Sequence, residues 1–332
     1  MGEHHKFIEI FEFLFYVFQT SPLKNLKRFY QKKDIISLMK QIAIIGPTAS
    51  GKSDLAIHVA QKYNGYILSI DSLSVYKEVD IVSAKPSKKE LCVVKHFGID
   101  EIYLNEYFSV EIFIRLYKEV EQLCLKEKKN LIIVGGTSFY LKMLLDGLSE
   151  IPTPSKEDVK WVEKQLEDLE EAYSFLSQKD PSYMQKISPS DRYRIEKALV
   201  IYKASKQIPS IFFQKNPPKP IIKDLPIFEI AVSRDVLRER IKKRTKQMLA
   251  LGLIDEVAFL EQKYTRKPNG MKAIGIIETL EYLDGKITKE ELEELVIVHT
   301  AQLAKRQQTF NRSQFKNIIS LPLEELYKKI LL

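Results

Sequence analysis

The sequence predicts an α/β fold, in which a parallel sheet core is flanked by helices and interrupted by an all-helical insertion. Three observations predict it. Short apolar runs alternate with amphipathic segments over the first 150 residues, and a glycine-rich loop directly follows the first run. The middle of the chain, in contrast, carries helical periodicity only.

Three short strands are expected in the first part of the chain. Apolar runs at 41–45, 66–70 and 131–134 have the length of buried strands. The segments at 52–63 and 108–129 carry apolar residues at helical spacing. Because strand–helix–strand order joins parallel strands through crossover helices, these elements predict one parallel sheet.

Two proline-rich breaks divide the chain, at 151–155 and 216–220, and the segment between them has only helical character. Residues 226–232 return to strand character, and the chain from 233 onward is interpreted as helical and strongly charged. We therefore expect a core domain of residues 40–150 and 222–332 and an all-helical insertion at 151–221.

The first 39 residues stand apart from this pattern. Their one apolar run, residues 7–18, carries two glutamates and has about half the length of a membrane span. It is also too acidic for a signal-peptide core. Since the first strand begins almost directly after Met39, we expect residues 1–39 to be a dispensable extension or a mis-assigned start; an amphipathic helix packed on the body is the alternative. No membrane segment is expected.

Composition excludes several classes of protein. With 45% hydrophobic and 29% charged residues among 332, the chain has the apolar content to fold, which excludes a disordered polymer. Two cysteines cannot form a disulfide scaffold or a four-cysteine zinc site, and they fit a reducing, cytoplasmic location. The net charge of +8 favours a polyanionic partner.

Residues 46–53, GPTASGKS, match the phosphate-loop pattern G-x-x-x-x-G-K-[ST] at every fixed position. A predicted strand precedes the loop and a predicted helix follows it, so the core is P-loop NTPase-like. Its glycines let backbone N–H groups face an anion at the positive end of the helix dipole, and the serine hydroxyl suits Mg²⁺. The residues predicted to bind a diphosphate or nucleotide are Gly46, Pro47, Thr48, Ala49, Ser50, Gly51, Lys52 and Ser53 (also the Mg²⁺ ligand). The loop indicates oligophosphate binding, but neither ATP nor hydrolysis.

Polar residues follow the next two strands. Asp71 comes directly after 66–70, where a carboxylate can bind Mg²⁺ or accept a proton, and a turn cap is the alternative. The third strand ends in Gly135–Gly136 rather than in the acidic ligand of an ordinary ATPase, and Thr137 then offers a hydroxyl. Thr137 is also a candidate helix N-cap, and both interpretations can hold together.

Basic residues concentrate in three separated regions. Residues 233–246 carry a net charge of +5. The other sets are Lys305, Arg306, Arg312 and Lys316 near the C-terminus and Arg192, Arg194 and Lys197 in the insertion. This distribution suits a long folded polyanion better than one small phosphate ester, with scattered surface charge as the alternative.

Seven runs occur in the order and spacing of the tRNA dimethylallyltransferases, and the chain resembles this family from residue 41 to about 315. The runs are GPTASGKS (46–53), IDSLSVYKEVDIVSAKP (70–86), VGGTSFYLKMLLDGLSEIP (134–152), DRYRIEKALVIY (191–202), RIKKRTKQMLALGLIDEV (240–257), AIGIIETLEYLDG (273–285) and TAQLAKRQQTFNR (300–312). The resemblance implies transfer of a dimethylallyl group from dimethylallyl diphosphate to the exocyclic amine of the adenosine 3′-adjacent to the anticodon, with release of diphosphate. It implies that dimethylallyl diphosphate and the tRNA anticodon stem-loop are partners, that Mg²⁺ is the cofactor, and that the insertion at 151–221 binds tRNA. We expect a monomer.

The resemblance also implies roles for particular residues. Asp71 matches the general base, Thr137 contacts the reacting region, and Arg240 balances the leaving diphosphate. The residues implied in tRNA binding are Asp71, Ser72, Leu73, Ser74, Thr137, Tyr193, Arg194, Ile195, Glu196, Lys197, Arg244, Lys305, Arg306 and Gln307, together with the stretch 273–278. Candidates to stack on an extruded base are Tyr76, Phe139 and Tyr140, with core packing as the alternative for each.

Three positions depart from the family's usual residues: Ile276 stands where an aromatic residue is common, Ala301 where an arginine is common, and Phe310 where a tryptophan is usual. They bear on tRNA contacts rather than on the diphosphate chemistry. His96, Cys92 and Cys124 show no metal-ligand spacing and are interpreted as structural. Two other functions stay open, a small-molecule kinase of the phosphate-loop class and a non-catalytic RNA-binding protein with a vestigial loop.

Overall fold

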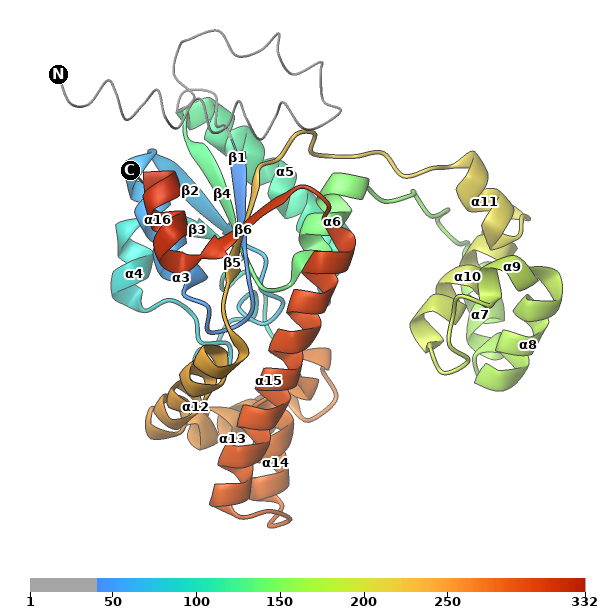
Figure 1. Ribbon diagram of the computed structural model, residues 1–332. Coiled ribbons are helices and arrows are strands. Elements are labelled where there is room, and N and C mark those ends of the chain that lie inside the picture. Colours follow the sequence, from blue (N-terminus) through green and yellow to red (C-terminus); the bar gives the residue numbers. More distant parts are fainter. Residues whose placement is uncertain (1–40, 332) are drawn as a thin grey trace, which may run out of the picture.

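The computed structural model describes residues 41–331, and a six-stranded sheet lies at its centre (Figure 1). The strand order is β3-β2-β4-β1-β5-β6 and every pairing is parallel. The strands are β1 (Gln41–Ile45), β2 (Gly65–Ser69), β3 (His96–Phe97), β4 (Asn130–Gly135), β5 (Ile227–Ala231) and β6 (Ile318–Pro322). The strands expected at 41–45, 66–70, 131–134 and 226–232 are confirmed as β1, β2, β4 and β5. The predicted N-terminal extension, 1–39, lies outside the described residues.

The expectation of helices alone after residue 233 is wrong at β6, which forms the edge of the sheet beside β5. Its five residues are partly or fully exposed and end in a proline, so they show neither the buried apolar run nor the alternation that signals a strand. The pairing with β5, about 90 residues away in the chain, creates this strand.

Helices cover both faces of the sheet because the strand residues alternate. Ile42 and Ile44 of β1 pack under α3 and α16, whereas Ala43 and Ile45 pack under α5 and α6. The helices of these two layers are α3 (Lys52–Lys62), α4 (Lys88–Val93), α5 (Val110–Glu127), α6 (Ser138–Asp146) and α16 (Leu323–Leu331). The helices expected at 52–63 and 108–129 are confirmed as α3 and α5.

A second group of helices lies beyond the carboxyl ends of the strands (Figure 1). It consists of α12 (Arg234–Ala250), α13 (Leu253–Tyr264), the 3-10 helix η2 (Asn269–Lys272), α14 (Ile276–Leu283) and α15 (Lys289–Gln314). Residues of α13, η2 and α14 share a buried apolar cluster with the loop that follows β2, including Val75, Val79 and Val82. This cluster holds that loop over the edge of the sheet where the strands end.

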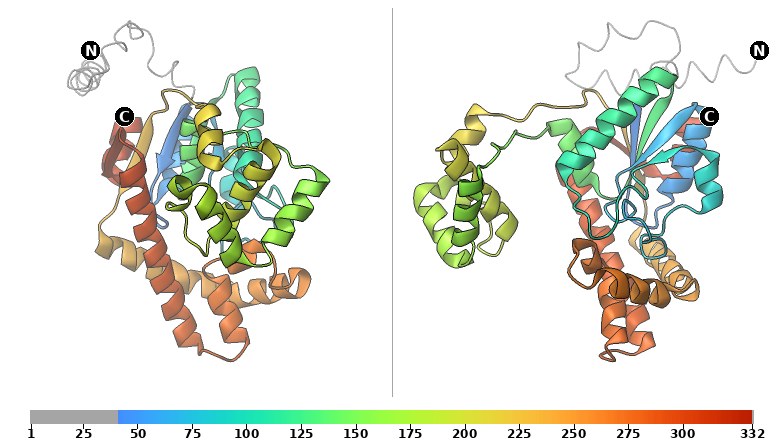
Figure 2. Two further views of the ribbon diagram at one scale, coloured as in Figure 1. Left: turned by 90° about the vertical axis from the view of Figure 1, so that its right-hand side faces the viewer. Right: turned by 180° about the vertical axis from the view of Figure 1, so that it is seen from behind.

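Residues 156–215 form a separate helical lobe, which two extended segments connect to the core (Figures 1 and 2). Its helices are α7 (Lys156–Gln165), α8 (Leu169–Lys179), α9 (Pro181–Met184), α10 (Arg192–Ser205) and α11 (Pro209–Lys215). They enclose their own apolar core, which includes Leu176 and Leu199. The connecting segments meet at their base, where the N–H groups of Ile221 and Ile222 donate to the carbonyl of Leu144.

Candidate active site

The phosphate loop lies between β1 and α3 at the carboxyl edge of the sheet. Ala49 and Gly51 adopt left-handed backbone angles, with φ of 62° and 93°, which turn the loop around its own centre. The Lys52 ammonium donates to the Pro47 carbonyl at 3.2 Å, so the lysine folds back across the loop. The first N–H groups of α3 therefore face the space in which an anion binds.

A small cavity of about 70 Å³ lies beside this loop. Strand β2 supplies one wall and the segment 83–86 supplies another. The residues that line it are Thr48, Lys52, Ser53, Ile67, Ser69, Asp71, Ser74, Ser83, Ala84, Pro86, His96, Ile99, Val134, Gly135 and Arg244. The cavity thus brings cationic, carboxylate and hydroxyl groups together with several aliphatic side chains.

Three charged groups interact in this cavity. Burial lowers the pKa of Lys52 to about 8; the Asp71 carboxylate opposes this shift and the Arg244 guanidinium adds to it. Burial also lowers the pKa of Arg244, and Asp71 again opposes the change. Two cations that face one carboxylate leave a site with an excess of positive charge, which suits a diphosphate.

Asp71 follows β2 and combines two of the interpretations drawn from the sequence. Its Oδ1 accepts from the N–H groups of Leu73 and Ser74, at 2.9 and 3.2 Å, so the side chain does cap a turn. Oδ2 accepts no hydrogen bond from the described residues. One oxygen therefore fixes the carboxylate in place and the other is available to a substrate.

Thr137 is brought next to this turn from the end of β4. Its Oγ1 accepts from the Ser72 N–H and donates to the Ser72 hydroxyl, both at 3.3 Å. Thr137 is the N-cap residue of α6, as expected, but its side chain makes no capping hydrogen bond. The hydroxyl instead connects the turn after β4 to the residue that follows Asp71.

The basic helix α12 contributes two arginines with different surroundings. Arg240 donates to the carbonyl of Ser50 at 3.1 Å and so braces the phosphate loop from outside the cavity. Arg244, one turn later on the same face, lines the cavity itself. Arg244 therefore lies next to the phosphate loop and Asp71, although the resemblance implied a role for it in tRNA binding.

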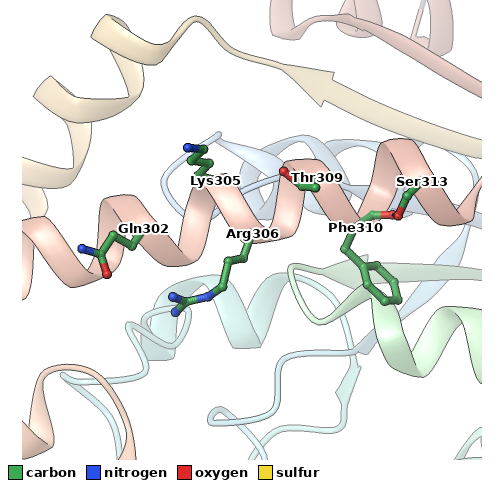
Figure 3. A pocket seen from close by; sticks show the side chains of 6 residues that line it. All are labelled: Gln302, Lys305, Arg306, Thr309, Phe310 and Ser313. Atoms are coloured by element: carbon green, nitrogen blue, oxygen red, sulfur yellow. The ribbon is translucent and has the colours of Figure 1, made fainter. Parts of the chain in front are cut away.

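A wide groove of about 600 Å³ runs along α15. Figure 3 shows the six side chains that line it: Gln302, Lys305, Arg306, Thr309, Phe310 and Ser313. Lys305 and Arg306 are exposed in it, as binding to a polyanion requires. Gln307 turns away from the groove, since its Oε1 accepts from the Thr48 N–H of the phosphate loop at 2.9 Å.

The five residues predicted to bind tRNA in the insertion lie at the start of α10. Tyr193 is exposed, and the Lys197 ammonium lies 5.4 Å from the centre of its ring. Arg194 is exposed and pairs with Asp191, and Glu196 is partly exposed. The side chain of Ile195 is fully buried in the core of the lobe, so it supports the helix and leaves only the backbone at this position for contact with a ligand.

The aromatic candidates for base stacking separate in the structure. Tyr76 is buried, and Tyr140 stacks on Phe113 with ring centres 4.7 Å apart, so core packing holds for both. Burial raises the pKa of Tyr140 to about 12. Phe139 is 45% exposed and is the candidate of the three that can meet a base.

Sequence reasoning missed one side of the cavity. His96, interpreted as structural, lines it together with Ile99 and the segment 83–86. Burial lowers the pKa of His96, and the hydrogen bond between its Nδ1 and the Val94 carbonyl, at 2.7 Å, opposes this shift. The run IDSLSVYKEVDIVSAKP contains 83–86, but only its first residues were given a role. The position of 83–86 depends on long-range contacts that no local pattern shows.

The described residues lack two features. Within 41–331, no group of three or more His, Cys, Asp or Glu side chains is arranged to hold a metal ion. Over the same residues, no helix has the length and hydropathy that crossing a membrane requires.

The fold and the site together define a class: a phosphate-loop α/β protein in which the loop adjoins a cavity that contains a free carboxylate oxygen. Comparison with known proteins identifies the family. A model described as IPP transferase matches residues 74–314. The chain is 64% identical over 293 residues to a tRNA dimethylallyltransferase of Sulfurimonas denitrificans, covering 88% of this chain and 99% of that one. It is 58% identical over 290 residues to one of Nautilia profundicola, covering 87% and 98%.

Solved structures agree with the sequence relatives. The full-length tRNA isopentenylpyrophosphate transferase of Bacillus halodurans matches with a TM-score of 0.65 and 29% identity, over 88% of this chain and 94% of that one. The corresponding protein of Staphylococcus epidermidis matches with a TM-score of 0.63 and 30% identity, over 87% and 96%. The chain belongs to the IPP transferase family, as the resemblance of its motifs indicated.

Proposed function

We propose that this chain transfers a dimethylallyl group from dimethylallyl diphosphate to the exocyclic amine of the adenosine 3′-adjacent to the anticodon of tRNA, and releases diphosphate. The close relatives are named for this activity. One observation carries the proposal: Asp71 shares a cavity with Lys52, Ser53 and Arg244 and keeps one oxygen free. A proton acceptor thus lies next to the site for the leaving group.

The chemistry requires this pairing. The exocyclic amine of adenine is a poor nucleophile, because its lone pair is delocalised into the ring. The allylic C–O bond must therefore break with help, and the Lys52 and Arg244 cations stabilise the negative charge that develops on the diphosphate. As the N–C bond forms, the amine proton passes to the free oxygen of Asp71. The Thr137 hydroxyl, held by Ser72, lies where the base enters.

The donor set fits Mg²⁺. The Ser53 hydroxyl lines the cavity beside the phosphate loop. Mg²⁺ takes few protein ligands and completes its shell with water and substrate phosphates, so this hydroxyl would hold the ion together with the diphosphate. When bound, the ion would neutralise charge on the departing diphosphate.

The tRNA would lie between the α15 groove and the lobe of residues 156–215. Lys305 and Arg306 face it from one side, and Tyr193, Arg194 and Lys197 at the start of α10 provide an aromatic ring and cations on the lobe. A base inside the anticodon loop must leave its stack to reach Asp71, and exposed Phe139 near the site can support it.

The direct test is transfer of a labelled dimethylallyl group. Purified protein is incubated with labelled dimethylallyl diphosphate, Mg²⁺ and total tRNA, and the modified nucleoside is identified after digestion. We expect label in tRNA and release of one diphosphate for each group transferred. Phosphate transfer from ATP without label in tRNA would support the kinase instead, and tRNA binding without either reaction would support the RNA-binding protein.

A further inference from the structure

One amide of the phosphate loop is already occupied by a side chain from a distant helix. The Thr48 N–H donates to Oε1 of Gln307 on α15 at 2.9 Å. The same side chain lies against Gly136 after β4, where an added Cβ would come within 2.4 Å of its Nε2. Since Thr48 lines the small cavity, Gln307 closes the space between the loop and the turn after β4.

The packing of α15 fixes Gln307 in this position. Ala304, three residues before it, and Asn311, four residues after it, lie on the same helical face and are fully buried. Nδ2 of Asn311 donates to the Glu229 carboxylate on β5 at 2.9 Å. The face that carries Gln307 is therefore held against the sheet, whereas Lys305 and Arg306 point into the groove.

Most of the other N–H groups of the phosphate loop have no acceptor among the described residues, in contrast to that of Thr48. Ser50 N–H donates to Pro47 within the loop. No acceptor among residues 41–331 pairs with the N–H groups of Ala49, Gly51, Lys52 or Ser53. The free donors from Ala49 to Ser53 thus lie on the α3 side of Thr48, whose own N–H is capped by Gln307. A polyphosphate that binds along the loop from α3 toward Thr48 therefore meets the free N–H groups first and Gln307 last.

We propose that Gln307 limits this loop to two phosphates and so selects an isoprenoid diphosphate over a nucleoside triphosphate. In phosphate loops that bind triphosphates, the backbone N–H groups and the lysine together surround the β- and γ-phosphates. A third phosphate that reaches Thr48 must break its hydrogen bond to Gln307 and displace a side chain that already touches Gly136. The specificity rests on the proposed function, because the diphosphate that it favours is the proposed donor.

The test compares inorganic diphosphate with inorganic triphosphate, each with Mg²⁺, by titration calorimetry on the full chain. We expect the wild type to favour diphosphate at least about tenfold, and Gln307→Ala to reduce this ratio below about threefold by binding triphosphate more tightly. Gln307→Glu should keep or raise the ratio, since its carboxylate still accepts from the Thr48 N–H and repels the more highly charged triphosphate more strongly. Gln308→Ala is the matched control: its amide donates to Val232 outside the loop, and the ratio should not change.

Two results would overturn the inference: an unchanged ratio in Gln307→Ala, or a ratio that falls only because diphosphate binds more weakly. The label-transfer assay on the wild type keeps the two proposals apart. A wild type that modifies tRNA while Gln307→Ala leaves the ratio unchanged overturns the role of Gln307 alone. A wild type that binds neither anion and modifies no tRNA overturns both.

Discussion

Asp71 has two functions that a single substitution can separate. Asp71→Asn keeps an oxygen for the N–H groups of Leu73 and Ser74 but removes the basic carboxylate. Because a positioned base contributes about 10²–10⁴-fold to a rate, we expect kcat to fall at least about 10²-fold. The tRNA dissociation constant should change less than about threefold. Single-turnover transfer measures the rate, and a gel-shift titration measures tRNA affinity. Equal losses of rate and of affinity would count against a role of Asp71 as base.

Lys52 predicts how donor binding depends on pH. Its pKa, lowered to about 8, means that the ammonium is charged below pH 8 and neutral above it. Since the diphosphate binds the charged form, its dissociation constant should rise about tenfold between pH 7 and pH 9. Lys52→Arg provides the control, because a guanidinium stays charged over this range. If the arginine variant shows the same rise, another group is responsible.

The site shows how far residue patterns alone can go. The loop and Asp71 were predictable because each directly follows a recognisable strand, and parallel strands end at one edge of the sheet. Whether Arg240 or Arg244 enters the cavity could not be predicted. Both lie on one helical face, and only the angle at which α12 packs decides between them. Gln307 was grouped with Lys305 and Arg306 by proximity in sequence, although a helix turns about 100° per residue and separates them.

At the level of elements, the strands flanked by helices could be predicted and β6 could not. Buried strands such as β1 and β4 appear as apolar runs because both faces are covered. An edge strand has no such requirement, and β6 exists because β5 pairs with it. The same limit applies to the segment 83–86, whose place in the cavity comes from α13.

Glu256 on α13 holds that segment in place. Its carboxylate accepts from three consecutive N–H groups, those of Asp80, Ile81 and Val82, at 2.8–2.9 Å. In Glu256→Gln the amide can satisfy only part of this set, so we expect the free energy of unfolding to fall by about 2 kcal/mol and the KM for the donor to rise. Denaturant unfolding of this variant and of Asp255→Asn, an exposed neighbour of equal charge, provides the comparison. Equal stability of the two variants would exclude the anchoring role.

The groove of α15 predicts a salt effect. If Lys305 and Arg306 each neutralise one tRNA phosphate, Lys305→Gln and Arg306→Gln should each lower the slope of log K against log salt concentration by about 0.7–0.9. Lys126→Gln is the control, because Lys126 is exposed at the end of α5, next to the amino end of β4 and far from the groove. Slopes equal to that of the wild type would remove α15 from the tRNA interface.

At the scale of the whole molecule, the chain divides binding between two bodies that meet at one narrow base. The lobe has its own apolar core, and the two connections already touch where they leave the sheet domain: a Cβ on Gly147 would come within 2.0 Å of the Lys219 carbonyl oxygen. Residues 149–217 can therefore be replaced by a Gly-Ser-Gly link without moving the cut ends far. The loop, Asp71 and Arg244 all lie outside the removed segment.

We expect this shortened chain to fold, with a dissociation constant for diphosphate within about twofold of the wild type. Its affinity for tRNA should fall at least about tenfold and label transfer should cease, because the cations and Tyr193 of α10 are gone. Calorimetry with diphosphate and a filter-binding titration with tRNA test these two expectations on one preparation of the shortened chain. Loss of diphosphate binding in a chain that still unfolds cooperatively would show that the lobe helps to form the donor site. Unchanged tRNA affinity would show that the groove of α15 is sufficient to bind tRNA, and the lobe would then act only in bringing the base to Asp71.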